Sequence, residues 1–356
     1  MPVNTVITGI GSFIPGIVVK NEDFLSHEFL QPDGKPFPYD NETIIRKFEE
    51  ITGITERRYA PEEMMTSDMA YLAAEKAIED AGVDRETLDY IIVAHNFGNV
   101  KQDAQQSDIL PALATRVKHS LGIENPYCVA YDILFGCPGW VEGVIQAHAF
   151  IKAGMAKKIL VIGAEALSRV VDIHDRDSMI YADGAGAAVI ERLEENKKRG
   201  ILGTATRTDA RQEAYYLYFG NSYNRKLDPD VRYIKMHGRK IYEYALNNVP
   251  QAMKSALDKT AVDIRNLKKV FIHQANEKMD EAIIKRFYRL YGETVPEYVM
   301  PMSIHKLGNS SVATIPTLLD LVYKNKLENQ SISRGDNILF ASVGSGMNIN
   351  AVVYKI

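Results

Sequence analysis

Cysteine is scarce in this chain, and several familiar sequence signals are missing altogether. Only Cys128 and Cys137 occur among 356 residues, too few for the disulfide framework of a secreted scaffold. No uncharged apolar run approaches the ~18 residues of a membrane span, and the first residues lack the basic and apolar regions of a signal peptide. We therefore expect a protein of a reducing compartment, the cytoplasm.

Clustered positive charge and metal-binding patterns are also missing. The 42 Lys and Arg residues are outnumbered by 46 Asp and Glu, for a net charge of -4, so nucleic acid is not an expected partner. The histidines are scattered, and neither a His-Glu-x-x-His nor a Cys-x-x-Cys pattern occurs. No metal site is expected.

Apolar β-branched runs alternate with segments of helical periodicity, a pattern that predicts an α/β fold. The charged run 191–199 is expected to cross the surface. The predicted strands are Val3 to Ile10, Leu88 to Ala94 and Lys158 to Gly163, and the predicted helices are Ser67 to Ala81, ended by Gly82, and Gly139 to Ala153.

The chain also resembles itself at one fixed offset. Residues 77–96 are similar to residues 256–275, and the same offset places 158–161 over 337–340. Two separate matches at one offset predict a duplicated α/β unit.

The two halves would occupy residues 1–190 and 200–356. A site is then expected between them, at the carboxyl ends of strands. Ala94 aligns with His273 at a strand end, so each half would contribute different chemistry to that site.

Cys137 lies between Gly136 and Pro138, directly before a predicted helix. Proline is favoured at a first helical position, and the unpaired N–H groups and dipole there favour a thiolate. The N–H of Cys137 could also bind an oxyanion. A nucleophile and a small buried side chain are both open readings, whereas Cys128 is expected only to pack.

Three further polar positions follow strands or begin helices. His273 ends an apolar strand and is followed by Asn276, which is compatible with a site or with a structural histidine. Asn309 follows Gly308 at the head of an apolar helix, either as a helix cap or as an amide donor. Ser345 lies in a Gly-Ser-Gly turn that could present N–H groups to an anion or simply reverse the chain.

Taken in this order, the segments resemble β-ketoacyl-[acyl-carrier-protein] synthase III, of the thiolase superfamily. The resemblance covers essentially the whole chain. It implies a thiolase-like α/β fold, in which duplicated α/β halves form a five-layer αβαβα sandwich. It also implies a homodimer. The matching pieces are Thr52 to Arg57, Cys137 before its helix, Tyr181 to Ala188, His273 to Asn276, Gly308 to Ser311, and the Gly-Ser-Gly turn 344–346.

The resemblance further implies a catalytic triad of Cys137, His273 and Asn309, as in the synthase III and chalcone synthase branch. Cys137 would attack an acyl thioester, and His273 and Asn309 would stabilise the enolate of a malonyl thioester. The N–H groups of Cys137 and Ser345 would form the oxyanion hole. The substrates would be acyl-CoA and malonyl-acyl-carrier-protein, with no cofactor.

Contacts to coenzyme A and to an acidic acyl carrier protein are implied in the same way. The expected substrate or CoA contacts are Arg176, Gly238, Arg239 and Asn276, and the expected docking residues are Lys278, Lys285 and Arg286. Lys47 and Ile51 stand where the family has an adenine-clasping tryptophan and arginine, so the acyl donor could be a carrier protein instead. The segment Asn96 to Ser120 is longer than the family's usual acyl-pocket loop.

The resulting hypothesis is a decarboxylating condensing enzyme that starts fatty-acid biosynthesis. An alternative is a specialised relative that joins two acyl thioesters, as in dialkylresorcinol or olefin pathways. A third reading, a non-catalytic homologue that binds acyl carrier protein, is disfavoured by the intact triad.

Overall fold

Two β-sheets organise the protein. The computed structural model describes residues 2–102, 104 and 106–356. The first sheet has the strand order β1-β7-β6-β4-β5, with β1 Val3–Phe13, β4 Tyr90–Ala94, β5 Val129–Ile133, β6 Lys158–Ala166 and β7 Asp183–Glu194. The second has the order β11-β12-β13-β8, with β8 Gly200–Thr208, β11 Leu267–Ile272, β12 Asn337–Gly344 and β13 Asn348–Lys355.

The sheets repeat one topology, which confirms the duplication. In the first, β6 is parallel to β4 and antiparallel to β7. In the second, β12 is parallel to β11 and antiparallel to β13. All strands of the first sheet come from residues 3–194 and all strands of the second from 200–355. Domain limits of 1–190 and 200–356 stay a prediction.

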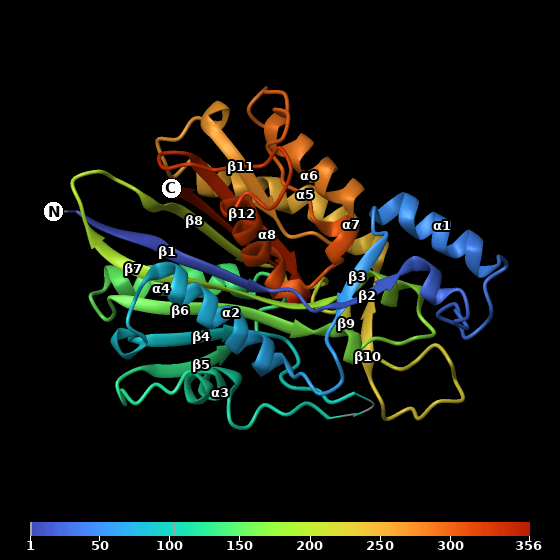
Figure 1. Ribbon diagram of the computed structural model, residues 1–356. Coiled ribbons are helices and arrows are strands. Elements are labelled where there is room, and N and C mark those ends of the chain that lie inside the picture. Colours follow the sequence, from blue (N-terminus) through green and yellow to red (C-terminus); the bar gives the residue numbers. More distant parts are fainter. Residues whose placement is uncertain (1, 103, 105) are drawn as a thin grey trace.

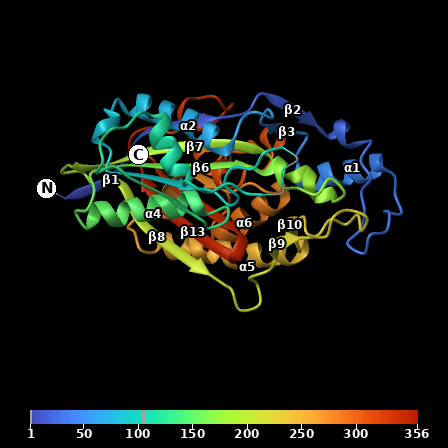
Figure 2. The same cartoon turned by 90° about the horizontal axis from the view of Figure 1, so that it is seen from below.

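Helices cover both sheets and fill the space between them. The longer helices are α2 Thr66–Ala81, α3 Leu113–Ser120, α4 Gly139–Lys152, α5 Gly238–Leu257, α6 Glu277–Arg289 and α8 Thr314–Tyr323. Buried side chains of α2 and α3 pack on the first sheet, those of α5 and α6 on the second, and those of α4 and α8 between the two. Figure 2 shows the layers in sequence, from α2 through β7 and β6, α4, and β8, to α5.

The central layer is held by close apolar packing. The indole of Trp140 on α4 is 1% exposed and meets the ring of Phe340 on β12 edge-on, with centroids 5.8 Å apart. Burying an aromatic side chain of this size stabilises a fold by about 2–3 kcal/mol. This packing fixes the head of α4 against the second sheet.

Two expectations about local structure need correction. The run 191–199 does not begin as a surface crossing, because β7 continues to Glu194 in register with β1. Helix α4 begins at Gly139, with Pro138 at the N-cap instead of the first helical position. The predicted end of α2 is confirmed: Gly82 adopts a left-handed conformation, with φ 62°, which glycine tolerates.

The remaining elements lie at one end of the molecule, away from the N-terminus (Figure 1). They are α1 Asn41–Thr52, α7 Ile304–Leu307, the paired strands β2 Ile17–Lys20 and β3 Glu56–Tyr59, and the paired strands β9 Leu217–Gly220 and β10 Tyr233–Met236. Among the described residues, no helix combines the length and apolar character needed to cross a membrane.

Candidate active site

A cavity of about 450 Å³ brings together residues from both halves of the chain. It is lined by Cys137 before α4, His273 after β11 and Asn309 before α8. Helix α1 contributes Ile44, Lys47, Phe48 and Ile51 to the outer wall. The three residues of the expected triad therefore face one space.

Cys137 is half-buried, and its sulfur accepts a hydrogen bond of 3.4 Å from the hydroxyl of Ser311. We expected the helix head to lower the thiol pKa. Instead, burial raises the pKa of Cys137 to about 11, and the Ser311 hydrogen bond opposes that rise only in part. The thiol is therefore protonated at neutral pH, and an attack on a thioester needs a group that accepts its proton.

His273 lines the same cavity as Cys137 and is the candidate for that role. Its backbone N–H donates to the carbonyl of Ala341 on β12 at 2.9 Å, which anchors it to the sheet. Burial lowers the pKa of His273 to about 4, so the imidazole is neutral at pH 7. Its Nδ1 has no hydrogen-bond partner among the described residues. A neutral imidazole can accept a proton, so His273 is a candidate general base for the thiol, although a pKa of about 4 makes it a weak one.

The backbone of Asn309 is hydrogen-bonded through both its N–H group and its carbonyl group. Its N–H donates to Ile180 O and its carbonyl accepts from Ala182 N, each at 2.9 Å. Its side-chain Oδ1 accepts the N–H of Ser311 at 2.8 Å. Ser311 reaches this position with a positive φ of 53°, a conformation that costs a non-glycine residue about 1–2 kcal/mol. The Nδ2 amino group of Asn309 is left as a donor at the cavity.

The backbones before and after Cys137 touch the glycine-rich turn that follows β12. A Cβ on Gly344 would lie only 2.9 Å from the Cβ of Cys137 and closer still to its N atom. A Cβ on Gly136 would lie 2.7 Å from the N atom of Ser345. Only glycine permits this approach, which brings the N–H groups of Cys137 and Ser345 into one neighbourhood.

The four expected substrate contacts all line the same cavity. Arg176 stacks over the ring of Phe37, and Arg239 is exposed and paired with Glu243. Gly238 begins α5 in open space. Asn276 also has a structural task, because its side chain caps α6 by accepting Met279 N at 3.0 Å. These contacts stay predictions.

The positions of the family's adenine clasp also lie on this cavity. The ammonium of Lys47 is 3.9 Å from the centroid of the exposed Tyr39 ring. Ile51 is half-exposed beside it on α1. Neither of these two side chains is itself a flat surface on which an adenine could stack.

The three expected docking residues are exposed on α6, and none lines the cavity that holds Cys137. Lys285 lines a separate groove with Arg289. Arg286 donates to Leu246 O at 3.1 Å and to Asn247 Oδ1 at 2.8 Å, which ties α6 to α5. In the described structure, Lys278 and Lys285 have no side-chain hydrogen bond to α5 like those of Arg286. These two lysines are therefore the docking candidates whose side chains do not also tie α6 to α5.

A second cavity of about 420 Å³ shares four lining residues with the first: Cys137, Tyr181, Leu217 and Asn309. Its walls are rich in aromatic side chains, including the stacked rings of Phe97 and Phe219, whose centroids are 4.8 Å apart. Ser345 lines this cavity. A space lined by aromatic rings and a few polar side chains next to the sulfur has room for an acyl chain.

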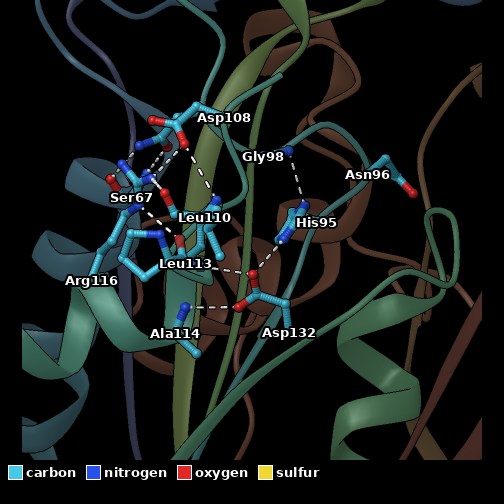
Figure 3. Close-up of polar contacts among 12 residues, drawn as sticks. Ser67, His95, Asn96, Gly98, Asp108, Leu110, Leu113, Ala114, Arg116 and Asp132 are labelled. Carbon is cyan, nitrogen blue, oxygen red and sulfur yellow. Dashed lines mark hydrogen bonds and ion pairs between the residues drawn. The ribbon is translucent and has the colours of Figure 1, made fainter. Parts of the chain in front are cut away.

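The long segment Asn96 to Ser120 is anchored at two places by one hydrogen-bonded histidine–aspartate pair; residues 103 and 105 lie outside the described part. His95 Nε2 lies 2.9 Å from Asp132 Oδ2, and its Nδ1 accepts the N–H of Gly98 at 3.0 Å. The same carboxylate accepts the N–H groups of Leu113 and Ala114, each at 2.7 Å, at the start of α3 (Figure 3).

Three residues at the site were not singled out by sequence reasoning. They are Asn96 after β4, Glu165 near the end of β6, and Ser311, which lies inside a quoted motif. Asn96 could have been found, because it is a polar residue two positions after the end of β4, the strand that corresponds to the one before His273. In the described part of the chain, no group of His, Cys, Asp and Glu could hold a metal ion.

The duplicated five-layer fold is that of the thiolase-like proteins. The chain matches the family described as 3-oxoacyl-[acyl-carrier-protein] synthase III over residues 131–210 and its C-terminal part over residues 257–356. The chain belongs to this family, and it is a condensing enzyme of the acyltransferase class.

Individual relatives agree over the full length. The chain is 33% identical over 350 residues to the β-ketoacyl-[acyl-carrier-protein] synthase III of Staphylococcus saprophyticus, covering 98% of both chains. The solved 3-oxoacyl-[acyl-carrier-protein] synthase III of Aquifex aeolicus is 30% identical, with a TM-score of 0.80 and coverage of 99% of this chain and 100% of that one. The solved structure of OleA from Xanthomonas campestris shares the fold. It is 18% identical to this chain, with a TM-score of 0.79 and coverage of 99% of this chain and 98% of that one.

Proposed function

We propose that this enzyme transfers an acyl group to Cys137 and then condenses it with a malonyl thioester, the reaction that starts fatty-acid biosynthesis. The observation that carries the proposal is the convergence of Cys137, His273 and Asn309 on one cavity from three separate elements. The family relatives named as β-ketoacyl-[acyl-carrier-protein] synthase III support the same reaction.

In the first half-reaction, the Cys137 sulfur attacks the carbonyl carbon of an acyl thioester while its proton passes to His273. The oxyanion of the tetrahedral intermediate is bound by the N–H groups of Cys137 and Ser345. One such donor contributes about 3 kcal/mol to lowering the barrier. The intermediate collapses to an acyl-cysteine, and the departing carrier thiolate takes the proton from the imidazolium.

In the second half-reaction, a malonyl thioester occupies the vacated space. Its thioester carbonyl accepts hydrogen bonds from His273 and from the Nδ2 group of Asn309. Carbon dioxide leaves as the enolate forms, and the enolate carbon attacks the acyl-cysteine. The carbon–carbon bond forms, the carbon–sulfur bond breaks, and the Cys137 thiolate departs and takes a proton from solvent.

The substrates would arrive on a phosphopantetheine arm through the first cavity. Arg176, Arg239 and Lys47 place positive charge along its lining, which suits phosphate groups. Because the positions of Lys47 and Ile51 provide no adenine-stacking surface, an acyl carrier protein is a donor as well suited as coenzyme A. No cofactor takes part in this scheme.

A second candidate function joins two acyl thioesters. It is favoured by the meeting of the two cavities, of about 450 and 420 Å³, at one sulfur. Such an arrangement gives each of two chains its own space.

Intact-mass spectrometry separates these functions. The protein is incubated with acyl thioesters of increasing chain length and then with malonyl-acyl-carrier-protein or with a second acyl thioester. We expect an acyl adduct on Cys137, absent in Cys137→Ser, that is discharged by the malonyl thioester with loss of carbon dioxide. Discharge only by a second acyl thioester would support the alternative, and an adduct that persists in Cys137→Ser would refute both.

We also propose a homodimer formed through β5, in a protein of the cytoplasm. β5 is an edge strand of the first sheet, and apolar side chains are exposed on it and next to its ends: Val129 in the strand is 46% exposed, Tyr127 before it 85% and Leu134 after it 66%. An uncovered apolar strand edge favours pairing with a second copy. Light scattering would test this proposal, because Val129→Lys should give a monomer with an unchanged circular dichroism spectrum.

A further inference from the structure

A continuous chain of hydrogen bonds leads from a buried carboxyl group to the sulfur of Cys137. Glu165 is 1% exposed near the end of β6. Its Oε1 accepts the backbone N–H of Asn96 and, at 2.8 Å, the side-chain amide of the same residue. The backbone N–H and the side-chain amide of Asn96 thus both donate to one oxygen of Glu165, which fixes the backbone and the side chain of Asn96 together.

The amide of Asn96 then orients a hydroxyl group. Its Nδ2 lies 3.2 Å from Ser311 Oγ as well as 2.8 Å from Glu165 Oε1, so both of its N–H bonds are used. Because Ser311 Oγ accepts from Asn96, its own proton is free to point to its other neighbour, the Cys137 sulfur at 3.4 Å. Hydrogen bonds in such a series polarise and strengthen one another.

The direction of the Asn96 side chain sets it apart from its neighbours in the same loop. Figure 3 shows Asn96 pointing away from the pair formed by His95 and Asp132. Asn99, three residues on, points elsewhere again and bonds with Ser67 at 2.9 Å. Asn96 lines the aromatic cavity together with Cys137 and Ser311.

We propose that Asn96, held by Glu165, is a positioning residue for the reaction at Cys137: it orients the Ser311 hydroxyl so that this group donates its proton to the sulfur. The sulfur bears negative charge twice in the cycle, when it attacks the acyl donor and when it leaves the acyl-cysteine. A donor fixed on the sulfur lowers the energy of both states. The proposal rests on the proposed function only in taking Cys137 as the nucleophile.

The charge state of Glu165 agrees with this task. Burial raises the pKa of Glu165 to about 8, although the Asn96 bonds oppose the rise. At pH 7 the group is therefore a neutral acid whose oxygen still accepts from Asn96. The other titratable groups that face this chain are His273 and Tyr181 on the side of the sulfur and Asp183 on the side of Glu165.

The first test measures the thiol directly. The rate at which iodoacetamide alkylates Cys137 is followed from pH 6 to 10 by mass spectrometry of its peptide, which separates it from Cys128. In Ser311→Ala and in Asn96→Ala, we expect the profile to move to higher pH and the rate at a given pH to fall about tenfold. Asn99→Ala, which removes a buried amide from the same loop, should match the wild type. Equal profiles in Asn96→Ala and Asn99→Ala would overturn the proposal.

The second test isolates Glu165. Glu165→Gln keeps an oxygen that accepts from Asn96 but cannot ionise, so it should alkylate like the wild type at pH 7. Above pH 8 the wild-type carboxylate disfavours the nearby thiolate, and the variant should react severalfold faster. Glu165→Ala, which releases Asn96, should behave like Asn96→Ala. A Gln variant that alkylates as slowly as Asn96→Ala at pH 7, or an Ala variant that alkylates like the wild type, would overturn the role of Glu165, and the Gln arm holds even where the Ala variant does not fold.

These readouts are independent of turnover. If no thioester acylates Cys137 but the alkylation profiles shift as described, the proposed function fails and the positioning chain stands. If acylation is normal and the profiles do not shift, the positioning chain fails and the proposed function stands.

Discussion

The backbone N–H of Ser311 donates a hydrogen bond of 2.8 Å to the side-chain Oδ1 of Asn309. This contact decides which way the Asn309 amide faces, because the oxygen is taken by the chain's own backbone. The Nδ2 group is then the atom that a substrate meets in the cavity. An asparagine suits this position because its amide carries an acceptor and a donor on the same planar group.

Asn309→Asp should therefore separate the two half-reactions. The carboxylate still accepts the Ser311 N–H but replaces a donor with a negative oxygen, which repels an enolate. We expect malonyl decarboxylation to fall at least about 100-fold while acyl loading of Cys137 persists. Release of carbon dioxide and intact mass measure the two steps, and equal damage to both would contradict this division of labour.

His273→Ala should show a pH dependence that the wild type lacks. With a pKa of about 4, His273 is neutral and able to accept the thiol proton at every pH well above that value, so wild-type loading should vary little from pH 6 to 9. Without the imidazole, loading depends on the small thiolate fraction of a thiol whose pKa is about 11. Loading in the variant should rise about tenfold per pH unit below that value. Decarboxylation should stay low at every pH, and a flat loading profile in the variant would exclude His273 as the base.

Gly344→Ala should disrupt the proposed oxyanion hole through the backbone. The added methyl group would press on the N and Cβ atoms of Cys137, neither of which can move without shifting the head of α4. We expect acyl loading to fall about 100-fold, as for loss of one oxyanion donor. Gly16→Ala, where no atom lies within 4 Å of the added Cβ, is the matched control. Comparable loading in both variants would place the oxyanion donors elsewhere.

Reversing charge on α6 should test carrier-protein docking. Lys278→Glu with Lys285→Glu changes the exposed face and leaves the Arg286 bonds to α5 in place. We expect a higher Michaelis constant for a carrier-protein thioester and a weaker dependence on salt. Turnover of a small pantetheine thioester should hardly change. If both substrates are affected alike, or neither is, the docking surface lies elsewhere.

Much of the fold was predictable because it depends on local pattern. The periodicity of residues 67–81 and the glycine after them define α2 and its end, and the single offset between the halves anticipates the repeated sheet topology. The positions of Cys137, His273 and Asn309 at element ends were readable for the same reason. Strand ends and helix heads are marked by short-range composition.

Other features depend on contacts between residues distant in the sequence, and only the tertiary structure decided them. The pKa of Cys137 is the main example: a helix head alone favours the thiolate, but burial outweighs it and raises the pKa. The link from Glu165 through Asn96 and Ser311 to the sulfur joins four separate segments of the chain, and no local pattern encodes it. The sequence by itself determined which residues stand at the ends of strands and helices. The packing of the two halves determined which of those residues share a space that excludes water. The reason is that solvation and hydrogen bonding depend on distances between residues, and only the folded chain sets these distances.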